Sequence, residues 1–251
     1  RKGSSDNDLA LGNALINMYA KCGLFSEALH FHEKLCVRDI GSWNALFTGY
    51  ALHKKAREAV DCLKCMQLEG LSPDSTTLTS ILKACSGMGS IQKGQMVHKE
   101  IILKGYEKDL SISNTLVSMY AKCGDFKKSQ EVLDELQFKG NNNISSWNAL
   151  IGGYILHGKE EAALNCFDQM KYKEGIPPDS ITFSCILKAC GKTGSLEMGE
   201  EVHKEVNKQR LLKKYDVLGN ALVDMYAKCN ALIKAQEVFN KLPMRDVVSW
   251  N

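Results

Sequence analysis

The sequence predicts an all-α protein, an α-solenoid superhelix of stacked helix-turn-helix repeats, and two observations carry this prediction. The first is internal repetition, because one helix-sized phrase is written three times. It reads NALINMYAKCG at 13–23, NTLVSMYAKCG at 114–124 and NALVDMYAKCN at 220–230. The second is that apolar residues within the phrase recur at i, i+3, i+4 and i+7, the spacing of one helix face. In the first copy they are Leu15, Met18, Tyr19 and Cys22.

Three phrase types rotate in a fixed order and divide the chain into a single array of seven repeats of 31 to 36 residues. The repeats are 9–39, 40–74, 75–109, 110–143, 144–179, 180–215 and 216–246, with partial repeats at 1–8 and 247–251. A glycine, such as Gly23, marks the turn after each first helix, and a second apolar stripe follows it. Since two helices cannot bury their apolar faces alone, neighbouring repeats must stack.

The bulk composition fits a folded chain with a sizeable core. It has 251 residues, 44% of them hydrophobic, and a formal net charge of +3, which is low for a nucleic-acid binder if charge alone is considered. No apolar run approaches the roughly 20 residues that span a bilayer, so no membrane partner is expected. The first and last residues read as parts of interrupted elements, so we expect the chain to be a fragment of a longer protein.

The ten cysteines are interpreted as small packing residues of a protein in a reducing compartment. Seven of them occupy equivalent places in the repeats: Cys22, Cys123, Cys229, Cys85, Cys190, Cys62 and Cys166. A zinc site is disfavoured, because Cys62 and Cys65 form a lone C-x-x-C pair without a second pair at zinc spacing. No cofactor is expected.

A polar stripe accompanies the apolar one on the first helix of three repeats. Residues spaced by four lie on one helix face, and here they are Asn13, Asn17 and Lys21; Asn114, Ser118 and Lys122; and Asn220, Asp224 and Lys228. An amide can donate to and accept from the edge of a base, and an ammonium suits a phosphate. The alternative is that the asparagine caps the helix and the lysine is a solvated residue near its end. Recurrence of the asparagine in six repeats favours ligand binding; the other three are Asn44, Asn148 and Asn251.

These phrases resemble pentatricopeptide repeat proteins, in particular the plant subclass whose short, standard and long repeats alternate. The short type is NALINMYAKCG, the standard type begins SWNALFTGY, and the long type begins STTLTSILKACSGMG. The resemblance spans residues 9 to 251 and implies sequence-specific binding of single-stranded RNA, one base per repeat. It further implies the targeting part of an RNA-editing or RNA-processing factor in a mitochondrion or chloroplast, with editing-complex proteins as further partners and any editing chemistry supplied from outside this span.

In that family the fifth and the last residue of a repeat select the base, and asparagine with aspartate favours uracil. Carried over, the uracil pairs are Asn13 with Asp39, Asn44 with Asp74, Asn148 with Asp179, and Asn220 with Asp246. Asn114 with Asn143 implies cytosine or uracil, Thr79 with Asp109 leans to guanine, and Ser184 with Tyr215 matches no known pair. The implied target, 5′ to 3′, is U-U-G-C/U-U-N-U. The lysines that would contact the RNA backbone are Lys21, Lys122 and Lys228.

Some positions depart from the family pattern. The second residue of each repeat, which in the family stacks on the base, is Ala10, Gly41, Thr76, Ser111, Ser145, Ile181 or Val217, and several of these are small. The aspartate of the PD dipeptides at 73–74 and 178–179 also has an alternative interpretation as an ordinary helix N-cap. Extra residues in LQFKGNNN leave the placement of Asn143 open.

Other motifs point away from catalysis within this span. GKTGS at 191–195 lacks the first glycine of a phosphate loop, and the two HKE triplets lack the cysteine pair of a zinc deaminase. No catalytic residue is predicted. Two alternatives to RNA binding remain open at this point: a protein-interaction scaffold of the tetratricopeptide type, and an array without a working ligand.

Overall fold

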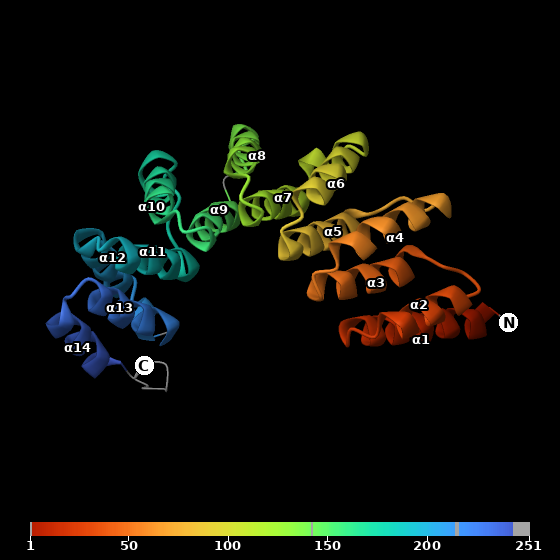
Figure 1. The fold of residues 1–251 in the computed structure, drawn as a ribbon, viewed down its shortest axis with the longest axis horizontal. Helices are drawn as coiled ribbons and strands as arrows, with labels where there is room; N and C mark the ends of the chain where they lie inside the picture. The colour runs from red at the N-terminus through yellow and green to blue at the C-terminus, as the bar shows by residue number, and fades with distance from the viewer. Residues whose placement is uncertain (1, 142, 214–215, 243–251) are drawn as a thin grey trace. The chain divides into compact units, whose positions relative to one another are not determined.

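The computed structural model describes residues 2–141, 143–213 and 216–242, and all regular structure among them is helical. The chain divides into two compact units, residues 1–136 and 137–251. Each unit is a stack of antiparallel helix pairs (Figure 1). The predicted all-α solenoid class is therefore confirmed.

The first unit holds four helix pairs, the last of which ends just past its boundary. Its elements are α1 (Lys2–Lys21), α2 (Phe25–Lys34), α3 (Ile40–Leu52), α4 (Ala56–Leu68), α5 (Ser75–Met88), α6 (Ile91–Leu103), the 3-10 turn η1 (Tyr106–Lys108), α7 (Leu110–Lys122) and α8 (Phe126–Phe138).

The second unit holds three helix pairs. Its elements are α9 (Ile144–Leu156), α10 (Glu160–Asp168), the π-helical turn η2 (Gln169–Lys173), α11 (Ser180–Thr193), α12 (Leu196–Lys208), the 3-10 turn η3 (Leu211–Lys213), α13 (Asp216–Lys228) and α14 (Leu232–Lys241).

Within each unit the odd-numbered helices form one layer and the even-numbered helices the other (Figure 1). In the first unit α1 packs on α3, α3 on α5 and α5 on α7, and in the second α11 packs on α9 and on α13. Apolar side chains fill the space between layers, where Phe47, Leu78, Tyr120, Trp147 and Phe183 are almost completely buried. The stripe predicted for the first helix is wrong in its residues, because Met18 and Cys22 are exposed, whereas Ile16 and Ala20 of α1 are fully buried.

The odd-numbered helices begin where the sequence predicts a repeat to begin. Six of them start at Ile40, Ser75, Leu110, Ile144, Ser180 and Asp216, each the first residue of a predicted repeat. The first repeat differs, because α1 runs without a break from Lys2 across the predicted boundary between residues 8 and 9. The starts of the six later odd-numbered helices agree with the division into seven repeats, which remains a prediction.

Most of these starts are set by a side-chain cap from the preceding residue, which satisfies backbone N–H groups that a helix leaves unpaired. Asp39 accepts from the Ser42 amide at 2.7 Å, Asp74 from the Thr77 amide at 2.7 Å, and Asp179 from the Thr182 amide at 2.8 Å. Asp109 and Asn143 cap α7 and α9 in the same way. The last residue of one predicted repeat therefore starts the first helix of the next.

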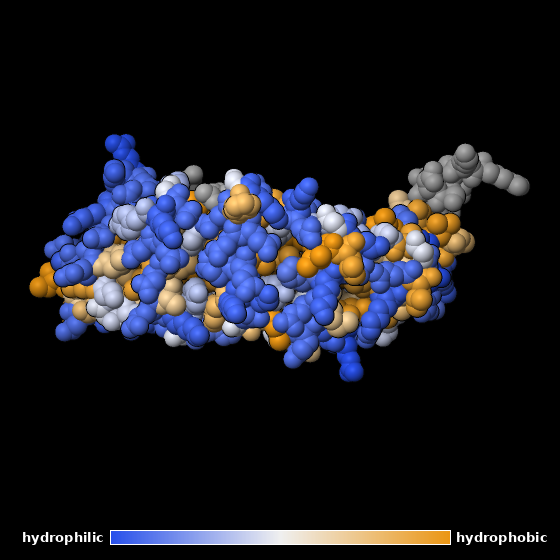
Figure 2. Space-filling view, turned by 90° about the horizontal axis from the view of Figure 1, so that it is seen from above, coloured by the Kyte–Doolittle hydropathy of each residue, from blue (hydrophilic) through white to orange (hydrophobic). Residues whose placement is uncertain are grey.

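The surface of the described residues combines charged side chains with scattered apolar ones. Figure 2 shows one face, on which hydrophilic residues predominate and hydrophobic residues lie in small groups between them. Every helix within the described ranges is too short or too polar to cross a bilayer.

Close approach of α1 and α3 depends on Gly49. A Cβ added there would lie 2.5 Å from the Cβ of Ala20 and 2.7 Å from its backbone oxygen, and a backbone atom cannot move aside as a flexible side chain can. Gly152 in α9 offers a matched control, since a Cβ at that position meets nothing within 4 Å.

We expect Gly49→Ala to destabilise the first unit by about 1–3 kcal/mol, the usual cost of overpacking. Gly152→Ala should instead stabilise by up to about 1 kcal/mol, because alanine has the higher helix propensity. Urea unfolding monitored by circular dichroism measures both. Equal effects of the two substitutions would contradict the close packing of α1 on α3.

Candidate nucleic-acid interface

The predicted base-reading residues of three repeats meet in the structure as side-chain pairs. The amide nitrogen of Asn13 lies 3.3 Å from the Asp39 carboxylate. The Asn44 amide nitrogen lies 3.2 and 3.3 Å from the two oxygens of Asp74, and that of Asn148 lies 3.1 Å from Asp179. The last of these pairs is in the second unit and the others are in the first, so the geometry recurs independently.

The asparagines are not helix caps. Asn44 and Asn148 are each the fifth residue of their helix, α3 and α9, and Asn13 lies well inside α1. The capping alternative weighed for the asparagines is therefore wrong. The capping interpretation of the aspartates is right, and it coexists with the pairing: Asp39, Asp74 and Asp179 each cap the following helix and accept from an asparagine.

Hydrogen bonding keeps the Asp179 carboxylate charged. Burial alone would raise the pKa of Asp179, but the Thr182 amide and hydroxyl and the Asn148 amide outweigh burial and hold that pKa below its usual value. Burial is likewise outweighed at Asp109, whose pKa is lowered by hydrogen bonds from the Ser75 hydroxyl and from two backbone amides. Asn148 therefore faces an ionised acceptor.

The predicted pair of the first long repeat is arranged differently. Asp109 accepts from the Ser75 hydroxyl at 2.7 Å, whereas the Thr79 hydroxyl donates to the Thr76 carbonyl at 3.1 Å. Thr79 is also buried, at 8% exposure. The first residue of this repeat, and not the fifth, is thus the hydrogen-bonding partner of its last residue.

The remaining base-reading residues that the structure describes lie on α7, α11 and α13 or at the start of α9. Asn114 and Asn220 are half-buried on α7 and α13, and Ser184 is half-buried on α11. Asn143 caps α9 in the second unit, whereas Asn114 belongs to the first unit. Tyr215 and Asp246 lie outside the described residues.

The three predicted backbone-contacting lysines are exposed, but they are not equivalent. Lys21 and Lys122 are the last residues of α1 and α7, and both are exposed. Lys228 is also exposed, yet its ammonium lies 2.7 Å from the Asp224 carboxylate one turn earlier. The places equivalent to Asp224 hold Asn17 and Ser118, which carry no charge. The charge of Lys228 is therefore partly compensated by a carboxylate on its own helix.

The second residue of every predicted repeat is exposed, from Ala10 in the first to Val217 in the last. Ile181 and Val217 are 60% and 70% exposed, although both are apolar. A Cβ added at Gly41 would lie 3.2 Å from the Asn13 amide nitrogen and 3.3 Å from an Asp39 oxygen. At this junction the second residue therefore adjoins the asparagine–aspartate pair of the preceding repeat.

Sequence reasoning missed two threonines that complete this arrangement. The Thr77 hydroxyl lies 2.7 Å from the Asn44 carbonyl oxygen, and the Thr182 hydroxyl lies 2.7 Å from that of Asn148. The available signal was the recurrence of threonine as the third residue of both long repeats, STT and SIT, where both standard repeats have serine.

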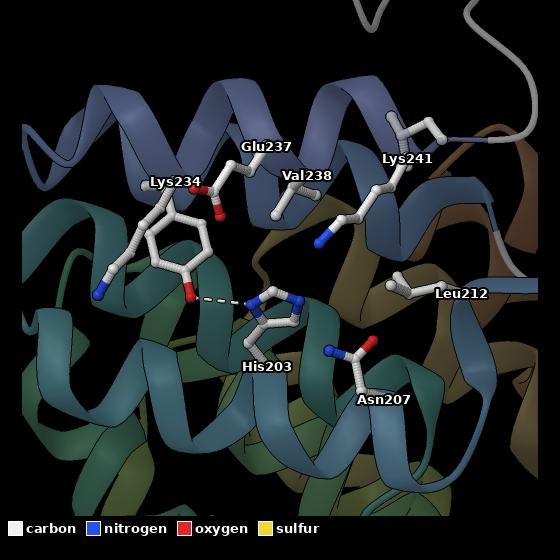
Figure 3. Close-up of a pocket in the computed structure, with 9 residues that line it drawn as sticks. His203, Asn207, Leu212, Lys234, Glu237, Val238 and Lys241 are labelled. Atoms are coloured by element: carbon white, nitrogen blue, oxygen red, sulfur yellow. Dashed lines mark hydrogen bonds between the residues drawn. The ribbon is translucent and has the colours of Figure 1, made fainter.

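A cavity of about 360 Å³ lies between α12, α13 and α14 (Figure 3). His203 and Tyr226 meet within it, with the imidazole Nδ1 2.9 Å from the hydroxyl, and Lys241 points towards the same ring. The same contact occurs in the first unit, where His98 Nδ1 lies 2.8 Å from the Tyr120 hydroxyl. The contact thus recurs as a structural joint between a long repeat and the next one.

The cysteines and acidic groups supply no further site. All ten cysteines are free, and Cys85, Cys166 and Cys190 are buried as the packing interpretation requires. Cys22 is exposed, so for this residue the packing interpretation is wrong. Within the described ranges, no group of three or more histidine, cysteine or acidic side chains could hold a metal ion.

Tandem helix pairs that repeat one amide–carboxylate pair at the same place define a helical-repeat protein. Models described as the PPR repeat family match residues 38–87 and 142–192, and a PPR repeat model matches 13–40, 111–141, 181–211 and 220–247. The chain belongs to the pentatricopeptide repeat family. The resemblance found in the sequence is thus confirmed at the level of the family.

Relatives and solved structures agree with this assignment. A chloroplastic pentatricopeptide repeat-containing protein of Arabidopsis thaliana is 33% identical over 97% of this chain, and a mitochondrial one is 35% identical over 98%. The chain spans only 28% and 38% of their lengths. The crystal structure of the pentatricopeptide repeat protein PPR10 in complex with an 18-nt psaJ RNA element matches 92% of the chain, and 34% of its own, with a TM-score of 0.70 at 20% identity. This likeness shows the shared fold, and the relatives' compartments bear out the organellar prediction for the family.

The two histidine–tyrosine contacts make the free energy of unfolding depend on pH. Burial lowers the pKa of both His98 and His203, and burial of the phenols raises the pKa of Tyr120 and of Tyr226 to about 12. Both histidines are thus favoured as neutral rings in the folded chain, whereas in the unfolded chain each takes up a proton near the ordinary value of about 6.5.

We expect the free energy of unfolding to fall as the pH drops from 7 towards 5, because the unfolded chain binds more protons in this window. The double substitution His98→Asn and His203→Asn should make that fall smaller, since the asparagine oxygen can still accept from the tyrosine but does not titrate there. His30→Asn, at an exposed position of α2, is the control for the exchange of a histidine for an asparagine. Urea unfolding at a series of pH values measures the effect, and a double variant with the wild-type slope would contradict it.

Proposed function

We propose that this chain binds single-stranded RNA in a sequence-specific way, reading one base per repeat, as the targeting part of an RNA-editing or RNA-processing factor in a mitochondrion or chloroplast. The observation that carries the proposal is the recurrent asparagine–aspartate pair, at 3.3 Å for Asn13, 3.2 Å for Asn44 and 3.1 Å for Asn148. A pair that served packing alone has no need to repeat the same two polar residues in both units.

The chemistry of the pair suits the edge of a uracil. Uracil presents one N–H between two carbonyl oxygens, and RNA-binding repeats read bases by hydrogen bonds to such edges. An asparagine amide has two N–H groups, so one can donate to the aspartate while the other donates to a base carbonyl. The charged carboxylate can accept from the base N–H. Asn44 with Asp74 and Asn148 with Asp179 are the most complete pairs of this kind.

Comparison with known proteins supports the same function. The structural neighbour PPR10 was crystallised with an RNA element, and the family models match most of this chain. The alternation of short, standard and long phrases in the sequence supports the proposal that the chain belongs to the plant subclass with three repeat lengths. Any editing reaction would then be supplied by another domain or by a partner protein.

A titration against three oligonucleotides tests the proposal. We expect the wild-type chain to bind single-stranded UUGCUAU more tightly than a permuted strand, and to bind a duplex of the same sequence weakest. Asn148→Ala should cost about 1–3 kcal/mol of binding free energy, mainly at the fifth nucleotide. Equal binding to all three oligonucleotides would remove the proposal, and a loss spread evenly over all positions would remove the role of Asn148.

The ion pair of Lys228 gives a test of the backbone contacts. We expect Asp224→Asn to strengthen binding to every sequence alike and to steepen the salt dependence by about 0.7 in the log–log slope, the value for one more phosphate contact on a single strand. The reason is that Lys228 lies 2.7 Å from Asp224 and must leave this carboxylate to meet a phosphate. Asp134→Asn, on an exposed helix face of the first unit, controls for the change of net charge. An equal effect of both substitutions would show that net charge alone is responsible.

A further inference from the structure

The amide of Asn44 is held at both ends. Its nitrogen lies 3.2 and 3.3 Å from the carboxylate oxygens of Asp74, and its carbonyl oxygen lies 2.7 Å from the Thr77 hydroxyl. Thr77 is itself fixed, because its backbone amide donates to Asp74 at 2.7 Å and its side chain is completely buried. The residue that holds the carbonyl end therefore belongs to the next repeat along the chain.

The same arrangement is present in the second unit. The Asn148 nitrogen lies 3.1 Å from Asp179, and its carbonyl oxygen lies 2.7 Å from the Thr182 hydroxyl. Thr182 is also completely buried, and its amide donates to Asp179 at 2.8 Å. Two copies in two separate units agree on each of these contacts.

This arrangement fixes which end of the amide a base can meet. A carboxylate only accepts, so it selects the nitrogen end of the asparagine, and a hydroxyl proton can serve the carbonyl end. The same hydroxyl also lies 2.8 Å from Asp74 in the first unit and 2.9 Å from Asp179 in the second, so its single proton is shared between the carboxylate and the asparagine carbonyl. When the proton serves the carbonyl oxygen, the asparagine has one unused N–H to offer. The base-facing group is thus a donor, and it pairs with an acceptor such as a uracil carbonyl oxygen.

The junction after the first repeat lacks the second contact. There Ser42 takes the place of the threonine, and its hydroxyl donates to the Asp39 backbone carbonyl at 2.8 Å. The carbonyl oxygen of Asn13 is buried and has no hydrogen-bond partner among the described residues. Only the aspartate therefore orients the Asn13 amide, and the chain contains its own comparison for the effect of the threonine.

We propose that Thr77 and Thr182 are specificity-determining positioning residues, each of which sets the orientation of the asparagine in the repeat before it. The selectivity of a standard repeat then depends on the third residue of the following long repeat, in addition to its own fifth and last residues. This inference rests on the proposed function, because selectivity has meaning only for a chain that reads RNA.

The test measures selectivity nucleotide by nucleotide, with RNA strands that carry uracil or cytosine at one position at a time. Thr77→Val keeps the shape of the side chain and removes the hydroxyl, and we expect the preference for uracil at the second nucleotide to fall by about two- to tenfold. The preference at the fifth nucleotide should not change. Thr182→Val should lower the preference for uracil at the fifth nucleotide and leave the preference at the second unchanged. Thr77→Ser retains a hydroxyl and should keep the wild-type preference.

Ser42→Ala is the matched control, because its hydroxyl does not serve the Asn13 carbonyl and its removal should leave selectivity at the first nucleotide unchanged. Thr77 also belongs to the cap of α5, so a measurement on the free protein is needed in case folding suffers. By NMR, the side-chain amide protons of Asn44 should exchange with water faster in Thr77→Val than in the wild type and Thr77→Ser.

The outcomes separate the two proposals. A wild-type chain without any preference for uracil would overturn the proposed function and this inference with it. A selective wild type whose Thr77→Val variant keeps the same preference at the second nucleotide would overturn this inference alone. An equal loss at all nucleotides would also overturn it, because it would assign Thr77 a structural role only.

Discussion

The carboxylate at the end of a repeat is the group on which the rest of the arrangement depends. Asp39, Asp74 and Asp179 each start the next helix by accepting its backbone amides, and each also accepts from an asparagine 26, 30 or 31 residues earlier. One side chain thus fixes where a helix begins and where the amide of the preceding repeat lies. Helix capping and the position of the asparagine amide cannot be separated in this fold, and loss of the carboxylate would affect both.

Packing in the odd-numbered layer sets the distance between successive pairs. The approach of α1 and α3 is limited by Gly49 against Ala20, and the asparagines lie on these same helices. The even-numbered layer is joined to the odd-numbered one by the histidine–tyrosine contacts, His98 with Tyr120 and His203 with Tyr226. Glycine and alanine lie where helix backbones meet, and histidine–tyrosine hydrogen bonds join the helix pairs. Together these contacts fix the positions of the asparagines within each unit.

Sequence periodicity predicted the helices and the starts of six odd-numbered ones, because a repeated phrase constrains each copy by the others. The side-chain pairs were implied by the resemblance to the family, and three of them meet in the structure. Neither predicted that capping and pairing coexist, because the aspartates were interpreted either as helix caps or as partners of the asparagines. A carboxylate accepts several hydrogen bonds and can therefore do both. The pair of Thr79 with Asp109 was expected by analogy, whereas Ser75 supplies the hydroxyl. Such choices depend on side-chain directions at a junction, which repeat spacing does not encode. Cys22 is exposed, whereas the equivalent Cys123 and Cys229 are partly buried.

The two units provide different surroundings for a base. In the second unit the exposed second residues include Ile181 and Val217, whose apolar side chains can lie against a base face. In the first unit the equivalent places hold Ala10, Gly41, Thr76 and Ser111, which offer little area. Stacking contributes on the order of 1–3 kcal/mol per base in single-strand binders, so on the proposed function the second unit gains from both stacking and hydrogen bonds. The first unit depends more on hydrogen bonds, which makes the orientation of its asparagines the main source of its selectivity.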